Sequence, residues 1–93
     1  MMNDEDLIRT ISYIKRSRNR TEIVLSLGES FKMPSEISRS MDLKISQISG
    51  ILSDLKKEGI VLCINEEEKV GRLYKLTEKG NEAYEIIKKN EES

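Results

Sequence analysis

Histidine is absent from this chain, and cysteine occurs once, at Cys63. Without histidine the chain lacks the side chain that titrates nearest to neutral pH, which is the commonest general acid or base and a frequent metal ligand. A lone thiol cannot form an intramolecular disulfide, and it cannot supply the several thiolates that structural zinc or an iron–sulfur cluster requires. We therefore expect neither an enzyme nor a metal or other cofactor, and we expect a reducing, cytoplasmic location.

Long apolar runs and an excess of positive charge are also missing. No stretch approaches the ~20 apolar residues of a transmembrane helix, and the first residues are acidic where a signal peptide is basic. We expect no membrane partner. The 16 Lys and Arg residues are balanced by 17 Asp and Glu residues, which gives a net charge of -1. This total at first argues against a nucleic-acid partner, because phosphate binding usually shows as a basic excess.

Apolar residues recur at helical spacing in the first third of the chain. The first predicted helix covers residues 4–16, and Asn3 or Asp4 is its expected N-cap. A polar joint over 17–21 follows, and then a second helix of about three turns. Gly28 is placed to end that helix.

Two further helices are predicted before residue 60. Pro34 opens the first of them, because its fixed φ and missing N–H suit the first helical position. The second covers 45–58, and Gly59 closes it as a left-handed cap. Its expected buried stripe consists of Ile45, Ile48, Leu52 and Leu55.

A β-hairpin is predicted next. The apolar, β-branched run over 60–64 is too short for a helix and is bounded by glycine and asparagine, which is typical of a strand. Residues 72–76 are its expected partner, so 65–71 forms the hairpin loop. Cys63 falls in the first strand, where we expect it to be a small core residue.

The order of these elements predicts the fold. Two helices joined by a tight turn, with a glycine and a two-stranded hairpin after the second, constitute a helix-turn-helix with a wing. We predict a mainly α fold with a small β-hairpin (α+β): a winged helix-turn-helix of five helices and a two-stranded wing, in one domain over 1–93. Two segments carry a closer resemblance, Leu52-x-x-Leu55-Lys56-Lys57-Glu58-Gly59-Ile60-Val61 and Gly71-Arg72-Leu73-Tyr74-Lys75-Leu76-Thr77-Glu78-Lys79-Gly80.

Together with Pro34-Ser35-Glu36-Ile37, these segments make the chain similar to winged helix-turn-helix transcriptional regulators of the ArsR/MarR type, in particular to their small archaeal members. The similarity extends over about residues 18–80. It implies a sequence-specific regulator that binds double-stranded DNA. Its recognition helix, 45–58, would enter the major groove, and its wing, 65–71, would lie on the backbone or in the minor groove.

The outward arc of the predicted helix 45–58 supports DNA binding without that resemblance. At about 100° per residue, small polar residues lie opposite the buried stripe, and small side chains permit close approach to a major groove. An ordinary solvated face is the alternative. Gln47 has a donor and an acceptor on one planar amide, which suits an adenine edge, and 45–55 contains no arginine, so we predict an A·T-leaning site read partly through DNA shape. The candidate base-reading residues are Ser46, Gln47, Ser49, Gly50 and Ser53.

Charge is distributed unevenly along the chain, so the total of -1 does not describe each face. Residues 7–20 carry five bases and no acid. The resemblance implies that the start of the second helix lies against the DNA backbone. Arg18 and Arg20 are therefore candidate phosphate contacts, together with Lys44 at the start of the recognition helix. A solvated loop is the alternative for any one of them.

The predicted wing departs from the family pattern. Its tip begins with three glutamates, 66–68, where family members commonly carry basic residues. Lys69 and Arg72 remain as candidate DNA contacts, and Arg72 matches the wing arginine of the family. We expect Arg72 to contact phosphate or a narrow minor groove while the glutamates point to solvent.

The terminal helices, 4–16 and 78–90, are additions to a minimal winged helix. Thr77 is the expected N-cap of the last helix, and we expect the tail, 91–93, to be frayed. A homodimer interface between these helices would place two recognition helices about one DNA turn apart. Completion of the monomer core is the alternative. The residues expected at the interface are Ile8, Ile11, Ile14, Tyr84, Ile86 and Ile87.

A small-molecule effector is not evident from the sequence. Metal-sensing relatives use clusters of cysteine and histidine, which this chain lacks, and 93 residues leave little room for a ligand cleft. The alternative function is a winged helix that acts as a protein–protein interaction module in a transcription or other assembly. The acidic residues 66–68 and the near-neutral total charge favour that alternative, whereas the basic segment and the small polar arc favour DNA.

Overall fold

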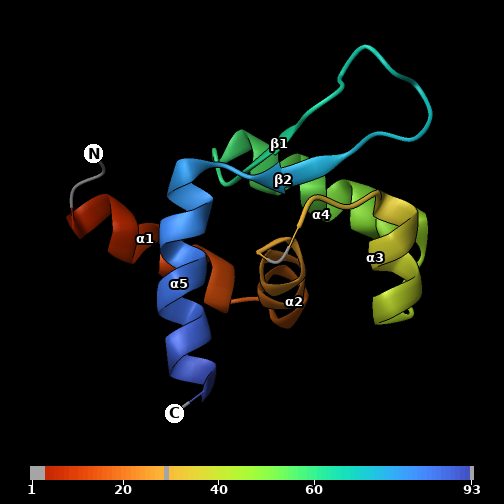
Figure 1. The fold of residues 1–93 in the computed structure, drawn as a ribbon. Helices are drawn as coiled ribbons and strands as arrows, with labels where there is room; N and C mark the ends of the chain where they lie inside the picture. The colour runs from red at the N-terminus through yellow and green to blue at the C-terminus, as the bar shows by residue number, and fades with distance from the viewer. Residues whose placement is uncertain (1–3, 29, 93) are drawn as a thin grey trace.

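The structure, a computed structural model, describes residues 4–28 and 30–92. These residues form five helices and two short strands, which confirms the predicted fold class. Figure 1 shows that the loop between the strands extends beyond the helices at one end of the molecule. The elements are α1 (Asp4–Lys15), α2 (Arg18–Leu27), α3 (Pro34–Met41), α4 (Ile45–Lys57), β1 (Val61–Cys63), β2 (Tyr74–Leu76) and α5 (Glu78–Glu92).

The joint between α1 and α2 is shorter than predicted. α2 begins at Arg18, inside the predicted polar joint over 17–21, and α1 ends at Lys15. The reason is a local cap: the Ser17 Oγ accepts a hydrogen bond from the Arg20 backbone N–H at 3.2 Å. An N-cap serine satisfies one of the unpaired N–H groups of the first turn, so the helix starts there despite its polar sequence.

The terminal helices begin where predicted, at residues 4 and 78. α5 continues to Glu92, beyond its predicted end at residue 90, and Ser93 lies outside the described residues. A lysine in the last turn of α5 faces the negative end of the helix dipole, which favours this extension. Asp4 is the first residue of α1, and Asn3, the other candidate cap, lies outside the described residues.

The two strands form an antiparallel hairpin in which Val61 is opposite Leu76 and Cys63 is opposite Tyr74. Each strand is shorter than predicted, so the wing loop covers 64–73. An additional backbone bridge, outside the two strands, was not predicted. Lys32, just ahead of α3, exchanges backbone hydrogen bonds with Tyr74 at 3.0 and 2.9 Å. This bridge ties the entry into the helix-turn-helix to the wing.

The core lies between all five helices and the base of the hairpin. Isolated helices of this length are marginal in water, so burial of one apolar face of each provides most of their stability. Cys63 is buried on β1, as predicted. The residues that form the core cluster are Ile14, Ile23, Val24, Leu27, Ile37, Ile48, Leu52, Leu55, Ile60, Val61, Leu76, Ala83, Tyr84 and Ile87.

Gly28 ends α2 as predicted, but the reason is space. Its backbone is right-handed, with φ -65°, a conformation open to any residue. A Cβ added at this position would lie 2.0 Å from a ring carbon of Tyr84 on α5. The glycine therefore permits the close approach of α5 to the end of α2.

The end of α4 and the start of α5 are fixed together. Gly59 has the predicted left-handed conformation, with φ +73°. The N–H of Ile60 donates to the Leu55 carbonyl at 2.9 Å, and that of Gly59 donates to the Lys56 carbonyl at 3.0 Å, which is a Schellman motif. The Thr77 Oγ1 accepts from the third N–H of α5 at 3.1 Å and donates to the Gly59 carbonyl at 2.6 Å. The predicted caps are therefore confirmed, and one hydroxyl links both helices.

Candidate nucleic-acid interface

The turn between α3 and α4 sets the direction of α4. Asp42 ends α3 in a left-handed conformation, with φ 56°, and its N–H donates to the Ser38 carbonyl. The Ser38 hydroxyl donates to the Leu43 carbonyl, and the Leu43 N–H donates back to the Ser38 carbonyl at 3.1 Å. Aspartate tolerates this conformation better than most residues. The tight connection holds α3 and α4 in the geometry of a helix-turn-helix.

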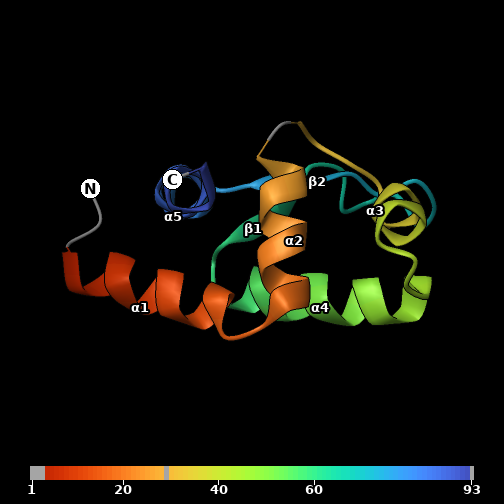
Figure 2. The ribbon, with the colours of Figure 1, turned by 90° about the horizontal axis from the view of Figure 1, so that it is seen from below.

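α4 presents the predicted polar face to the outside. Ile48, Leu52 and Leu55 are fully buried, and Figure 2 shows α4 along one edge of the molecule with α2, α3 and α5 on its inner side. Nothing lies within 4 Å of the position that a Cβ at Gly50 would take. A shallow hollow surrounds this glycine. The five residues predicted to read bases are all exposed on this outer side, namely Ser46, Gln47, Ser49, Gly50 and Ser53.

Gln47 has a partner within the helix. Its side-chain Oε1 accepts a hydrogen bond from the Lys44 backbone N–H at 3.2 Å, so it caps the first turn of α4. The bond is exposed to solvent. A bidentate contact between the Gln47 amide and an adenine edge therefore requires that this weak bond open.

Ile45 contradicts the predicted buried stripe. Its side chain is 53% exposed, whereas Ile48, three residues later, is fully buried. The spacing correctly places these residues on neighbouring sides of one helix. However, Ile45 is the first residue of α4, and Met41 at the end of α3 and Leu43 in the turn are only partly buried. The start of the helix thus lies at the margin of the core, which periodicity alone does not reveal.

The candidate cations differ in their surroundings. Arg18 and Lys44 are exposed. Arg20 is half-buried: its Nη1 donates to the Tyr13 carbonyl at 2.8 Å, and its guanidinium lies 4.0 Å from the centre of the Tyr13 ring. These contacts fix the corner between α1 and α2. Arg18 and Lys44 therefore offer their charges outward, while Arg20 is engaged within the fold.

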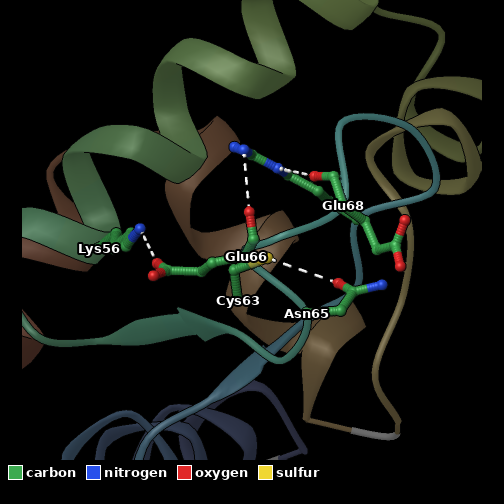
Figure 3. A network of polar contacts seen from close by, with 6 residues as sticks. Lys56, Cys63, Asn65, Glu66 and Glu68 are labelled. Carbon is green, nitrogen blue, oxygen red and sulfur yellow. Dashed lines mark hydrogen bonds and ion pairs between the residues drawn. The ribbon is translucent and has the colours of Figure 1, made fainter.

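The wing is folded back on itself and attached to α4 (Figure 3). The Glu66 carboxylate forms an ion pair with the Lys56 ammonium near the end of α4. Arg72 donates from Nε to the Glu68 carbonyl at 2.7 Å and from Nη2 to the Glu66 carbonyl at 3.2 Å. All three glutamates are exposed, as expected, and Glu66 in addition pairs with a lysine.

The ion pair changes the acidity of both partners. The hydrogen bond and charge of Lys56 lower the pKa of Glu66 from 4.5. The hydrogen bond from Glu66 raises the pKa of Lys56 from 10.5. Both groups are therefore charged over the neutral pH range, and the pair joins the wing to α4 there.

Asn65, which the sequence did not single out, closes the base of the wing loop. Its Oδ1 accepts from the Leu73 N–H at 2.8 Å and from the Cys63 thiol at 3.6 Å, and its Nδ2 donates to the Gly71 carbonyl at 3.2 Å. An asparagine directly after a predicted strand is the available signal, because its short amide readily bonds nearby backbone groups. Lys69 lies exposed at the far end of this closed loop.

The residues predicted for a dimer interface differ in how deeply they are buried. Ile14, Tyr84 and Ile87 lie in the monomer core, in agreement with the alternative for these three. Ile11 and Ile86 are partly buried. Ile8 on α1 is 67% exposed. An apolar strip on the outside of α1 and α5 is therefore smaller than the sequence indicated.

Within residues 4–28 and 30–92, no three His, Cys, Asp or Glu side chains lie together in a way that could hold a metal ion. None of the helices in this described part of the chain combines the length and the apolar character needed to cross a membrane.

Neither a protein-family model nor a curated protein matches the sequence of this chain. Solved structures do match. HlyU from Vibrio cholerae has 17% identity and a TM-score of 0.78, with 100% of both chains covered. A double mutant of ZitR from Lactococcus lactis has 16% identity and a TM-score of 0.74 over 82% of this chain, which spans only 53% of ZitR.

A third similar structure is the homodimeric winged helix-turn-helix DNA-binding domain of Mb0332 from Mycobacterium bovis, a possible ArsR-family transcriptional regulator. Its identity is 15% and its TM-score 0.74, with 98% of this chain and 88% of that chain covered. These likenesses show that the chain has the winged helix-turn-helix fold.

Proposed function

We propose that this chain is a sequence-specific transcriptional regulator that binds double-stranded DNA. The observation that carries the proposal is the outer face of α4, where small polar side chains surround Gly50 and leave open space. A recognition helix must approach base edges closely, and long side chains on this face would hold it away. The resemblance of the sequence and the descriptions of similar structures favour the same function.

The proposed contacts fall into two groups. The base-reading group is the set on α4 already described, with Gln47 on an adenine after its capping bond opens. In the phosphate group, Arg18, Lys44 and Lys69 act through exposed side chains. Arg20 and Arg72 each donate a hydrogen bond to a backbone carbonyl, and both add positive charge from these positions. Arg72 reaches a phosphate only after its bonds to the wing carbonyls break.

A duplex titration at two salt concentrations tests the proposal. Counterion release lowers log K by about 0.9 per phosphate contact for each tenfold rise in salt. With phosphate contacts from Arg18, Lys44, Lys69 and the released Arg72, the slope should be about -4 per subunit, or about -7 for a dimer. A duplex selected from random sequences should have an A·T-rich core at fixed salt. No binding at low salt would exclude this function and favour the protein–protein interaction module, for which the exposed Glu67 and Glu68 are the available contacts.

We further propose a homodimer formed through the outer sides of α1 and α5. Of the residues predicted for this interface, Ile8, Ile11 and Ile86 are those that the monomer leaves partly or largely uncovered. Ile8→Glu should convert the dimer into a monomer in sedimentation equilibrium at micromolar concentration and leave the helical circular dichroism unchanged. A wild-type chain that sediments as a monomer at that concentration would contradict the dimer.

We propose that this regulator is of the ArsR/MarR type, similar to its small archaeal members, and acts in the cytoplasm; the resemblance of the sequence segments supports this proposal. We propose that it works without a cofactor or small-molecule effector and is either constitutive or controlled by a partner protein. Addition of candidate metal ions should leave the titration curves unchanged, and a shift of the curve would contradict this part of the proposal.

A further inference from the structure

Ile45 is a large apolar side chain that remains 53% exposed at the first position of α4. Single exposed apolar residues are common on protein surfaces, so exposure by itself has no meaning. The position of Ile45 on α4 makes its exposure informative. It lies where the buried side of α4 meets the polar outer face, and its exposed neighbours there, Ser46 and Ser49, are short and polar.

Packing does not account for this side chain. The stripe that α4 buries begins at Ile48, and about half of Ile45 remains in contact with water. Side chains of a helix lean toward its N-terminus, so Ile45 projects at the leading end of α4. In helix-turn-helix proteins, the N-terminal residues of the recognition helix contact base edges.

We propose that Ile45 contacts the 5-methyl group of a thymine in the major groove and thereby selects thymine at one position of each half-site. The inference rests on the proposed DNA-binding function. Each base pair presents a distinct pattern in the major groove, and the thymine methyl is the apolar group within that pattern. An aliphatic side chain offers no hydrogen bond, so this methyl is the base feature that it recognises.

The contact also fits the rest of the face. Serines choose weakly between bases, and the Gln47 amide is held by its capping bond to Lys44 in the free protein. An apolar contact needs no such rearrangement. Ile45 would thus supply thymine selection at the start of the helix, beside the adenine contact proposed for Gln47.

Uracil substitution isolates the methyl group. In the duplex selected by the wild-type chain, each thymine is replaced singly by deoxyuridine, and affinity is measured by fluorescence anisotropy at fixed salt. One position per half-site should weaken wild-type binding about fourfold, the factor that corresponds to one buried methyl. The Ile45→Ala variant should bind the thymine duplex more weakly than the wild type does, by a similar or larger factor. The variant should bind the uracil duplex as tightly as it binds the thymine duplex.

Two control variants accompany this comparison. Phe31→Ala removes another exposed apolar side chain, between α2 and α3, and should keep the full uracil effect. Ile45→Val, which lacks one carbon, should keep part of the uracil effect. The folded state of every variant is checked by circular dichroism.

The outcomes separate this inference from the proposed function. If Ile45→Ala retains the wild-type preference for thymine over uracil, or if the wild-type chain binds DNA with no such preference at any position, Ile45 does not read thymine and the DNA-binding proposal stands. If the wild-type chain binds no duplex at low salt, both the thymine contact and the DNA-binding function are wrong.

Discussion

Substitution of Gly50 should change stability and DNA binding in opposite directions. This glycine lies within α4 on the proposed DNA face, and a Cβ added there meets nothing within 4 Å. A helix-interior glycine is less stable than alanine by about 0.5–1 kcal/mol, because the unfolded chain loses more freedom at glycine. With open space at the site, Gly50→Ala should realise this gain.

The magnitude follows from the size of the chain. For a domain of 93 residues, 1 kcal/mol corresponds to a shift of about 4–8 °C in Tm. Gly50→Ala should therefore raise Tm by about 2–8 °C in thermal unfolding. Gly50→Leu should give a similar rise, because leucine is nearly as good a helix former as alanine.

DNA binding distinguishes the two variants. The alanine methyl is small and should weaken binding only a few-fold. The leucine side chain fills the hollow that α4 presents, and overpacking a close contact costs about 1–3 kcal/mol, which is a loss of about fivefold to more than a hundredfold. Affinity is measured on the selected duplex at one salt concentration, with the alanine variant as the matched control.

Two results would refute this reasoning. A Gly50→Leu chain that binds as tightly as the wild type would show that this face does not approach DNA. A fall in Tm for Gly50→Ala would show that the space beside the glycine is occupied in the folded protein.

Three further predictions concern the wing and the core. Because the pKa of Glu66 is lowered and that of Lys56 raised, their contact stabilises the folded wing at neutral pH and is lost as pH falls below 4.5 or rises above 10.5. In an NMR titration, Lys56→Gln should return the Glu66 midpoint toward 4.5, and an unchanged midpoint would disprove the pairing. Arg72→Ala should weaken binding to all duplexes and flatten the salt slope by about one contact; an unchanged slope counts against a phosphate contact. Gly28→Ala should destabilise the fold by about 1–3 kcal/mol in urea unfolding, since its methyl meets the tyrosine ring of α5, and a neutral effect would show that the ring moves freely.

The sequence predicted much of the fold because many of its determinants are local. The spacing of apolar residues located the helices, and the caps at Gly59 and Thr77 depend on residues close to them in the chain. The strands were recognisable by composition, although pairing shortened both. The exposed polar face of α4 was also predictable, since Ile48 and its partners fix which side of the helix is buried.

Contacts between elements were decided only in the tertiary structure. Two arginines two residues apart, Arg18 and Arg20, have the same charge, yet one is exposed and the other is held over the Tyr13 ring. Glu66 pairs with Lys56, ten residues earlier. Long charged side chains have several partners within reach, and only the packing of helices determines which partner is near. By itself, the sequence determined which segments are helices or strands and which face of each is apolar, whereas the tertiary structure decided which charges remain available to a partner and that Ile45 lies outside the core.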